Sequence, residues 1–490
     1  MTNITNNVNN KYKKYYSSHV ENDTYFGLGI ENECYFVFDE FAIVTGKELK
    51  NNTKPDRYCV NYYNNFKKDN LKKFYDKINN NDLFKIPIIM NSHYITKYDK
   101  FGECNTIKYK VDNPKFNGTT LFQLLMNKGK NFREMYDKYF SFDGDTFEFT
   151  TQHFYKTTVE DCVNELFTIK QIIINEIQSI VNSEKISISK FGNFSFQKYN
   201  FGFAKILTNY NNIALCNNAT YHINITLPIK LNSKKEIEDF GHFRYIHKKA
   251  IKIIQWIEPL IIACYGSPDI FSIYNPEFSS GSQRIALSRY ISIGTYDTKK
   301  MITGKLLNSY HYSKVSNKNK IWYNKYHQNS GYNPPKSIGY DFNFNKFKNH
   351  GIEIRFLDYF PEFYLQDFIN ILLLLCQFSL SNPELKSDLN PIDNDVWNDF
   401  TVNCIKYGSK VTISQKYYEI IKTIFVISDI DSVNPINMLT EIVKTLYLKY
   451  KDEDFIRNIS PNMKLPKIYN FNEIMYNIHV NTLFPLKREN

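Results

Sequence analysis

The sequence predicts an α+β fold in which helices surround a curved, largely antiparallel sheet. Three observations support this prediction. Short segments that alternate apolar and polar residues, as strands do, recur along the chain. Stretches with helical periodicity separate them, and strands that return after long helical excursions are typical of α+β proteins. The chain of 490 residues, 42% of them hydrophobic, is also long enough to bury a large core.

The N-terminal part is expected to begin with a polar, disordered tail over residues 1–20. Strands at 24–38 and 41–44 are expected to pair through a turn at Asp39–Glu40. Further strands are predicted at 139–154, 187–208, 219–230 and 351–359.

Helices are predicted from apolar periodicity and from capping boxes, in which Ser or Thr and a Glu three residues later satisfy each other's backbone groups. Thr157 with Glu160 is expected to open a helix to about 183, and Ser233 with Glu236 one to Tyr265. The other predicted helical regions are 118–140, interrupted near Gly129, then 362–380, and starts at Thr412–Gln415 and Asn434–Pro435. Residues 266–345 are expected to be rich in loops.

Composition limits the classes of function. The formal charge of +11 is spread along the chain as Lys, so we do not expect nucleic acid as a partner. The eight cysteines form no CxxC pair, which argues against a zinc ribbon or a disulfide scaffold and favours a reducing compartment. The N-terminus has no apolar signal-peptide core, and the apolar run 368–380 is too short to span a membrane. We therefore expect a buried helix at 368–380 and a cytoplasmic protein without a membrane partner.

Four segments share an unusual pattern. They are FGLGIENECYF (26–36), TFEFTTQ (146–152), TYHINITLP (220–228) and GIEIRFLDYFP (351–361). In each, one parity is apolar and is expected to face a core: Leu28, Ile30, Phe36, Tyr221, Ile223, Ile225, Leu227, Ile352, Ile354 and Phe356. The other parity carries Glu31, Glu33, Glu148, His222, Asn224, Glu353 and Arg355. If the four strands are neighbours in one sheet, this face is an acidic cavity for metal ions and a phosphorylated ligand.

The polar parity suggests a chemistry. Glu31 and Glu33 share a face with Gly27 and Gly29, which are expected to leave room for a bulky ligand. Neighbouring carboxylates repel and raise each other's pKa unless cations neutralise them. Mg²⁺ or Mn²⁺ suits an oxygen-rich site with one imidazole. Arg355 could then clamp a transferring phosphoryl group, and Asn224 could orient the ligand or a neighbouring carboxylate.

Each signal also has a structural interpretation. A GxExE segment can be a solvated edge strand, and His222 can be a structural histidine. Glu353 with Arg355 can be a cross-strand ion pair, and Asp143 with Asp145 can form only a turn. Four such coincidences in one chain favour the functional interpretation.

The order and wording of these segments resemble the glutamate–cysteine ligase family, within the glutamine-synthetase-like superfamily of carboxylate–amine ligases. The resemblance extends over about residues 24–380. Its matches are GIENE (29–33), TFEFTTQ (146–152), YHINITLP (221–228), CYGSPDIF (264–271), LSRYISIGTY (287–296) and GIEIRFLDYFP (351–361).

The resemblance implies a glutamine-synthetase-like catalytic fold with its active site in the sheet funnel. The implied domains are a ligase catalytic domain at 21–380 and a helical C-terminal part at 381–490 packed on it. ATP would phosphorylate the γ-carboxylate of glutamate, and the amine of cysteine would then attack, with Mg²⁺ or Mn²⁺ as cofactor. The implied metal ligands are Glu31, Glu33, Glu148, His222 and Glu353. The implied catalytic residues are Glu353 and Arg355, the ATP contacts Arg355 and Asn224, and the substrate contacts Arg289 and Tyr296.

The sequence departs from the family pattern in the amine-binding segment. Thr295 separates Gly294 from Tyr296, where the family has Tyr directly after Gly, and the family's Ser-Asp pair is replaced around Ser292. Two alternatives therefore stay open. The chain can be a carboxylate–amine ligase with another amine acceptor, or a non-enzymatic descendant of the fold.

Overall fold

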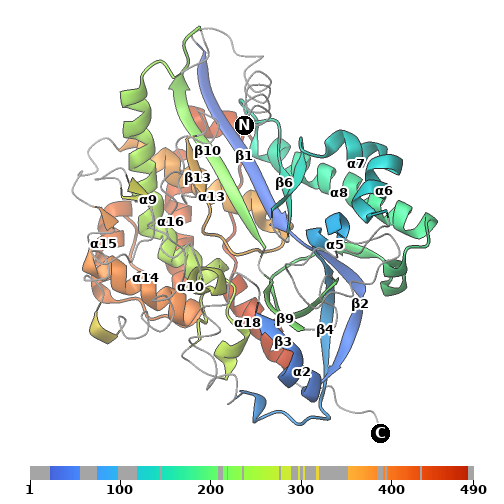
Figure 1. Cartoon of the computed structure of the whole chain (residues 1–490). Coiled ribbons are helices and arrows are strands. Elements are labelled where there is room, and N and C mark those ends of the chain that lie inside the picture. Colours follow the sequence, from blue (N-terminus) through green and yellow to red (C-terminus); the bar gives the residue numbers. More distant parts are fainter. Residues whose placement is uncertain are drawn as a thin grey trace.

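The computed structural model describes residues 23–55, 74–97, 119–143, 146–207, 213–217, 219–233, 237–274, 278–287, 296–297, 302–303, 316–318, 351–382, 390–391, 394–430 and 433–483. It confirms a mixed α+β structure with two mainly antiparallel sheets and helices around them (Figure 1). The expected tail 1–20 and Glu236 of the second predicted capping box lie outside the described residues.

The first sheet carries the four patterned segments. Its strand order is β13 (Ile352–Ile354), β10 (Thr220–Lys230), β1 (Thr24–Cys34), β6 (Thr146–Thr150) and β5 (Phe140–Asp143), and every neighbouring pair is antiparallel. The long strands β1 and β10 run side by side through the centre of the molecule (Figure 1). Strands that are far apart along the chain, such as β1 and β10, are thus brought into direct contact.

The second sheet has the order β3 (Thr53–Pro55), β9 (Ile213–Asn217), β8 (Phe201–Ile206), β4 (Leu83–Met90), β2 (Phe36–Thr45) and β7 (Phe194–Phe196). The chain passes from the first sheet to the second at Tyr35, which lies between β1 and β2. A separate ladder joins β11 (Tyr296–Asp297) and β12 (Ile302–Thr303).

The predicted turn at Asp39–Glu40 is wrong. Both residues lie within β2, and the pairing of β2 with β4 shifts register between Val37 and Phe41. Such an irregularity lets a strand carry extra polar residues outward without reversing direction. Asp39 is also held by its backbone N–H, which donates to the carbonyl of Asn193 at 2.8 Å.

Helices surround the two sheets (Figure 1). They are α2 (Gly46–Asn52), α5 (Ser92–Lys97), α6 (Leu121–Lys128), α7 (Lys130–Met135), α8 (Val159–Ser183), α9 (Phe240–Tyr265), α10 (Gln283–Leu287), α13 (Leu365–Ser381), α14 (Asp395–Tyr407), α15 (Gln415–Phe425), α16 (Pro435–Tyr450), α17 (Asp454–Ile459) and α18 (Phe471–Leu483). Helices α13, α14, α16 and α18 pack on α9. Short 3₁₀ helices lie at Ser187–Phe191, Ile270–Ile273, Glu362–Tyr364 and Gly408–Lys410.

Most predicted helix ends are confirmed, but two starts are displaced. Helix α8 is capped by Thr158, whose side chain accepts the N–H of Asp161, one residue later than predicted. Helix α9 starts only at Phe240, because Asp239 caps it by accepting the N–H of His242 at 2.8 Å. The interruption at Gly129 and the start at Asn434–Pro435 are as predicted. The predicted strand at 187–208 is replaced in its first part by a 3₁₀ helix.

The apolar run at 368–380 lies in a buried helix, as predicted. The helical stretch Glu362–Ser381 is 20 residues long and contains an 18-residue window with a mean hydropathy of 1.5, so it is long and apolar enough to cross a membrane by length and composition alone. The run 368–380 was predicted to be too short for a span, and the helical stretch that contains it is longer than the run. However, 72% of that window is buried inside the structure, where α13 packs against α8, α9 and α16.

Candidate metal and phosphate site

The alternating residues of the four segments lie on two faces of the first sheet, apolar on one and polar on the other, as the sequence predicts. The apolar parity is buried, with each side chain no more than 1% exposed: Leu28, Ile30, Phe36, Tyr221, Ile223, Ile225, Leu227, Ile352, Ile354 and Phe356. Cross-strand register places polar partners directly opposite each other on the other face. Glu31 lies opposite His222, Glu33 opposite Glu148, and Asn224 opposite Glu353.

An imidazole and two carboxylates meet at the centre of this face. One oxygen of Glu31, one of Glu353 and one nitrogen of His222 all lie within 4.8 Å of one another. His222 Nδ1 is 3.2 Å from Glu31 Oε2 and 3.8 Å from Glu353 Oε1. All three residues are buried, and ligand atoms so close together can share one cation with small adjustments.

The imidazole of His222 is neutral at physiological pH. Burial lowers its pKa to about 3, and the charge of Arg355 acts in the same direction, while the hydrogen bond with Glu31 opposes both. A neutral imidazole has one N–H and one lone pair, and the lone pair is what a metal ion requires. The contacts between His222 and the carboxylates are therefore not ion pairs.

A second pair of carboxylates lies on the other side of the ring. Glu33 Oε1 is 3.7 Å from His222 Nε2, and Glu148 lies directly across from Glu33 on β6. Within the described part of the chain, Nε2 is buried and has no hydrogen-bond partner. If Nδ1–H donates to Glu31, the lone pair of Nε2 faces the carboxylate of Glu33, and a cation between them would remove the repulsion.

Arg355 lies at the edge of the same cluster. Its Nη1 donates to Glu353 Oε1 at 3.0 Å, and its side chain is 14% exposed. This ion pair agrees with the structural interpretation of the Glu353–Arg355 spacing. It also leaves a partly exposed guanidinium beside the buried carboxylates, where a phosphate could contact it. The amide oxygen of Asn224 is buried next to this pair and has no hydrogen-bond partner among the described residues.

The expected space above Gly27 and Gly29 is not present. The ring of Phe154 covers both glycines, and a Cβ added to either would lie 2.0 Å or 2.8 Å from it, respectively. Phe154 is 3% exposed. The glycines therefore admit an aromatic side chain of the protein, and this part of the face holds no room for a ligand in the present structure.

The predicted substrate contacts are not placed. Arg289 lies outside the described residues. Tyr296 lies in β11, and the structure describes only its backbone. The described cysteines Cys34, Cys162, Cys264, Cys376 and Cys404 are free and buried, in line with the prediction that they form no disulfide scaffold.

Two polar residues behind the polar face, one on β1 and one on α8, were not singled out from the sequence. Asn32 and Lys170 are 0% and 1% exposed, and the Lys170 Nζ donates to Asn32 Oδ1 at 2.7 Å. Both could have been noticed, because each interrupts an apolar pattern. Asn32 stands at the apolar parity of its strand, and Lys170 stands between Ile169 and Ile173 on the buried side of α8.

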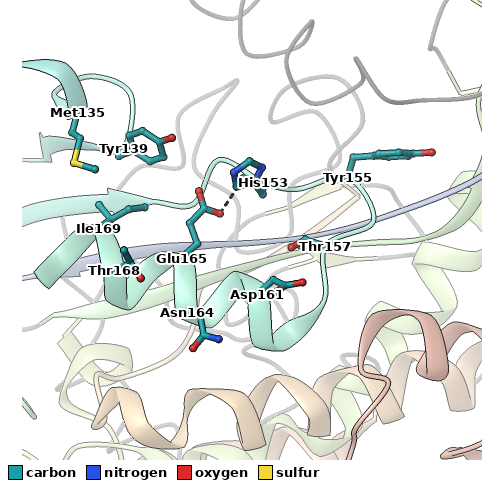
Figure 2. Close-up of a pocket in the computed structure, with 10 residues that line it drawn as sticks. All are labelled: Met135, Tyr139, His153, Tyr155, Thr157, Asp161, Asn164, Glu165, Thr168 and Ile169. Atoms are coloured by element: carbon teal, nitrogen blue, oxygen red, sulfur yellow. Dashed lines mark hydrogen bonds between the residues drawn. The ribbon is translucent and has the colours of Figure 1, made fainter. Parts of the chain in front are cut away.

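A separate cavity of about 610 Å³ lies beside the first half of α8 (Figure 2). None of the predicted site residues lines it. Its lining includes Tyr139, His153, Tyr155, Asp161 and Glu165. Glu165 accepts the backbone N–H of His153 at 3.1 Å, so this carboxylate has a structural task at the wall of the cavity.

Comparison with known proteins adds one relative. No family model matches the chain. A protein of Acanthamoeba polyphaga mimivirus, described as uncharacterized protein R704, is 40% identical over 492 residues, which cover 99% of this chain and 85% of that protein. The similarity extends over nearly the whole chain.

Proposed function

The chain belongs to the family of the mimivirus protein R704, and we propose that it is an ATP-dependent carboxylate–amine ligase with a glutamine-synthetase-like catalytic fold. One observation carries the proposal. Three neighbouring antiparallel strands bring a carboxylate oxygen of Glu31, a carboxylate oxygen of Glu353 and a nitrogen of His222 within 4.8 Å, with Arg355 beside them. Separate structural roles would not require these groups to meet on one face.

The residues of this face fit divalent metal ions. The donors are carboxylate oxygens and one neutral imidazole, a set that suits Mg²⁺ or Mn²⁺. Because a neutral imidazole has a single lone pair, His222 can ligate one cation. Glu31 and Glu353 flank its Nδ1, and Glu33 with Glu148 lies on the Nε2 side. The imidazole lone pair points to only one of these two carboxylate pairs. The other pair would hold a second cation through oxygen atoms alone.

The bound metal ions would neutralise negative charge on the phosphates of ATP. Arg355 would bind the transferring phosphoryl group, because its planar guanidinium matches phosphate oxygens. Glu353 holds Arg355 in place through the 3.0 Å contact. Asn224, directly across the strands from Glu353, would donate its amide N–H to the same ligand.

The proposed reaction has two steps. A substrate carboxylate attacks the γ-phosphorus of ATP, which gives an acyl phosphate and ADP. An amine then attacks the acyl carbon, inorganic phosphate leaves, and the amine loses a proton as the amide forms. The buried face of β1 and β10 would protect the acyl phosphate from water.

The resemblance described above suggests glutamate as the carboxylate donor and cysteine as the amine acceptor. The assignment of cysteine as the amine acceptor depends on the segment 287–296, where the chain departs from the family pattern. A different amine acceptor is therefore the second form of the same proposal, and the assay below separates the two.

The proposal is tested by ADP release from purified protein with ATP, Mg²⁺ and glutamate, with and without cysteine. Glu353→Gln should lower the rate by at least about 10²-fold, because it removes a charged ligand without changing volume. Glu419→Gln, an exposed change on α15, is the matched control and should keep the rate.

The outcomes separate the hypotheses. Release that depends on cysteine, with a γ-glutamylcysteine product, supports a glutamate–cysteine ligase. Release with another amine supports a ligase with a different acceptor. No release with any amine, together with no rise of the melting temperature in ATP and Mg²⁺, would leave a non-enzymatic descendant and contradict the proposal.

A further inference from the structure

Asn32 is an amide on the face of β1 that otherwise holds apolar residues. It lies between Glu31 and Glu33, the two carboxylates that β1 contributes to the polar face, and it is 0% exposed. An apolar side chain would be buried there at lower cost, since a buried amide must satisfy all of its polar atoms. Its presence therefore calls for a task beyond packing.

The amide of Asn32 ties two strands of the site together. Its Nδ2 donates to the carbonyl of Thr220 on β10 at 3.0 Å and, at 3.4 Å, to the carbonyl of Glu33. Thr220 precedes His222 by two residues, and its hydroxyl donates to the carbonyl of Leu357 at 2.6 Å. These bonds fix the backbone of β1 and β10 beside the carboxylates and connect it to the chain that follows β13.

Lys170 of α8 binds the oxygen atom of the Asn32 amide. Its Nζ donates to Asn32 Oδ1 at 2.7 Å and is paired with Glu362, whose side chain is 13% exposed. Burial alone would lower the pKa of Lys170, but the carboxylate of Glu362, together with Tyr359 and Cys34, raises it overall. The Nζ also lies 4.3 Å from the centre of the Phe196 ring, which further stabilises a cation. Lys170 is therefore a charged, fully buried donor.

A buried ion pair contributes little to stability compared with an apolar replacement, and its best-attested use is to fix one arrangement among several. Here the fixed arrangement is that of β1. Successive side chains on a strand point to opposite faces, so holding the amide of Asn32 also sets the direction of the two carboxylates that flank it. The network thus lies directly behind the metal cluster.

We propose that Lys170 and Asn32 are positioning residues, which set the orientation of Glu31 and Glu33 for metal binding through hydrogen bonds on the reverse face of β1. This inference rests on the proposed metal site. Partners of this kind that orient metal ligands usually change metal affinity about 10–100-fold when they are removed.

The test measures the dissociation constant of Mn²⁺ alone, from the electron paramagnetic resonance signal of free Mn²⁺, at a temperature where each variant is folded. Asn32→Leu and Lys170→Met are each expected to weaken Mn²⁺ binding by about 10-fold or more. The double variant should bind Mn²⁺ about as weakly as the weaker-binding of the two single variants and no more weakly. Both substitutions act through one network, so their effects should not add. Lys205→Met, which removes a buried Lys from β8 in the second sheet, is the matched control and should bind Mn²⁺ normally.

The experiment separates two kinds of failure. If the wild type binds no Mn²⁺, or if Glu353→Gln leaves its binding unchanged, the metal site itself is wrong. If wild type binds Mn²⁺ and Glu353→Gln abolishes binding, while Asn32→Leu keeps normal affinity, the positioning role is overturned and the network is only structural. Asn32→Leu puts an apolar side chain of similar size on an apolar face, so it decides the question even if Lys170→Met does not fold.

Discussion

Asp358 shows how burial changes the chemistry of a single residue. It is 3% exposed and accepts hydrogen bonds from the hydroxyl of Ser282 and from the backbone N–H groups of Ser267 and Arg284. It therefore fastens the segment 278–287 to the chain that follows β13. Burial raises the pKa of Asp358 to about 6, even though these hydrogen bonds and the charge of Arg284 oppose the change.

This pKa predicts how stability depends on pH. The native state binds the proton of Asp358 more tightly than the unfolded chain, whose value is 3.8. The contribution of Asp358 to stability is thus fully present below pH 3.8 and is lost as pH rises through about 6. Asp358→Asn cannot ionise, so its free energy of unfolding relative to wild type should rise between pH 4 and pH 7, by roughly 3 kcal/mol at about 1.36 kcal/mol per pKa unit. Urea unfolding at a series of pH values measures it, and a difference that stays flat would contradict the pKa.

At the residue scale, polarity and parity predicted which side chains share a face. They could not predict the contacts within it. The 3.0 Å bond between Arg355 and Glu353, and the 3.2 Å contact of His222 with Glu31, depend on rotamers that no spacing specifies. In the sequence, Asn32 and Lys170 stand out only as polar residues at apolar positions. Their hydrogen bond to each other could not be predicted, because the two residues are more than 100 positions apart along the chain.

At the element scale, strand alternation was a reliable guide and turn chemistry was not. The period of two fixes the faces of β1, β10 and β13 wherever one face is buried. The prediction of a turn at Asp39–Glu40 failed because two exposed acidic residues fit a strand irregularity as well as a turn. The strand continues through Asp39 and Glu40 because β2 pairs with β4 and β7, which come from other parts of the chain.

The segment after β6 explains why the room expected above the glycines is missing. It continues along β1. The backbone N–H of Thr151 donates to the carbonyl of Ile30 at 3.0 Å, and the backbone N–H of Leu28 donates to the carbonyl of Phe154 at 3.2 Å. This path places the Phe154 ring over the two glycines. Local sequence does not show that residues beyond a strand will remain against its neighbour.

The packing of Phe154 on Gly27 gives a prediction for this segment. Gly27→Ala puts a Cβ 2.0 Å from the Phe154 ring and should lower the free energy of unfolding by about 1–3 kcal/mol. Adding Phe154→Ala should make the cost of the Gly27 change much smaller, because the clash is then absent. The matched control is Gly241→Ala in the first turn of α9, where a Cβ would lie 3.2 Å from Asp239. This control should be neutral or stabilising by up to about 1 kcal/mol, and equal losses for both glycines in urea unfolding would show that the ring does not occupy this space.

At the scale of the whole molecule, the strand order β13–β10–β1–β6 joins segments that lie far apart in the sequence, from residue 24 to residue 354. The order of strand and helix patterns predicted an α+β protein, but the neighbours of each strand follow from long-range packing that local patterns do not contain. The order of the motifs suggested these neighbours through a family resemblance. Apolar residues from both sheets and from the C-terminal helices form one continuous buried cluster, which supports the polar face from behind.

The central claim is that the polar face of the first sheet binds divalent metal ions at His222. Anomalous diffraction from crystals soaked in Mn²⁺ tests it directly. We predict a peak at about 2 Å from one ring nitrogen of His222 and from carboxylate oxygens of the flanking Glu residues, and its loss in Glu353→Gln or Glu33→Gln crystals. Well-diffracting Mn²⁺-soaked crystals with no anomalous peak beside His222 would contradict the account.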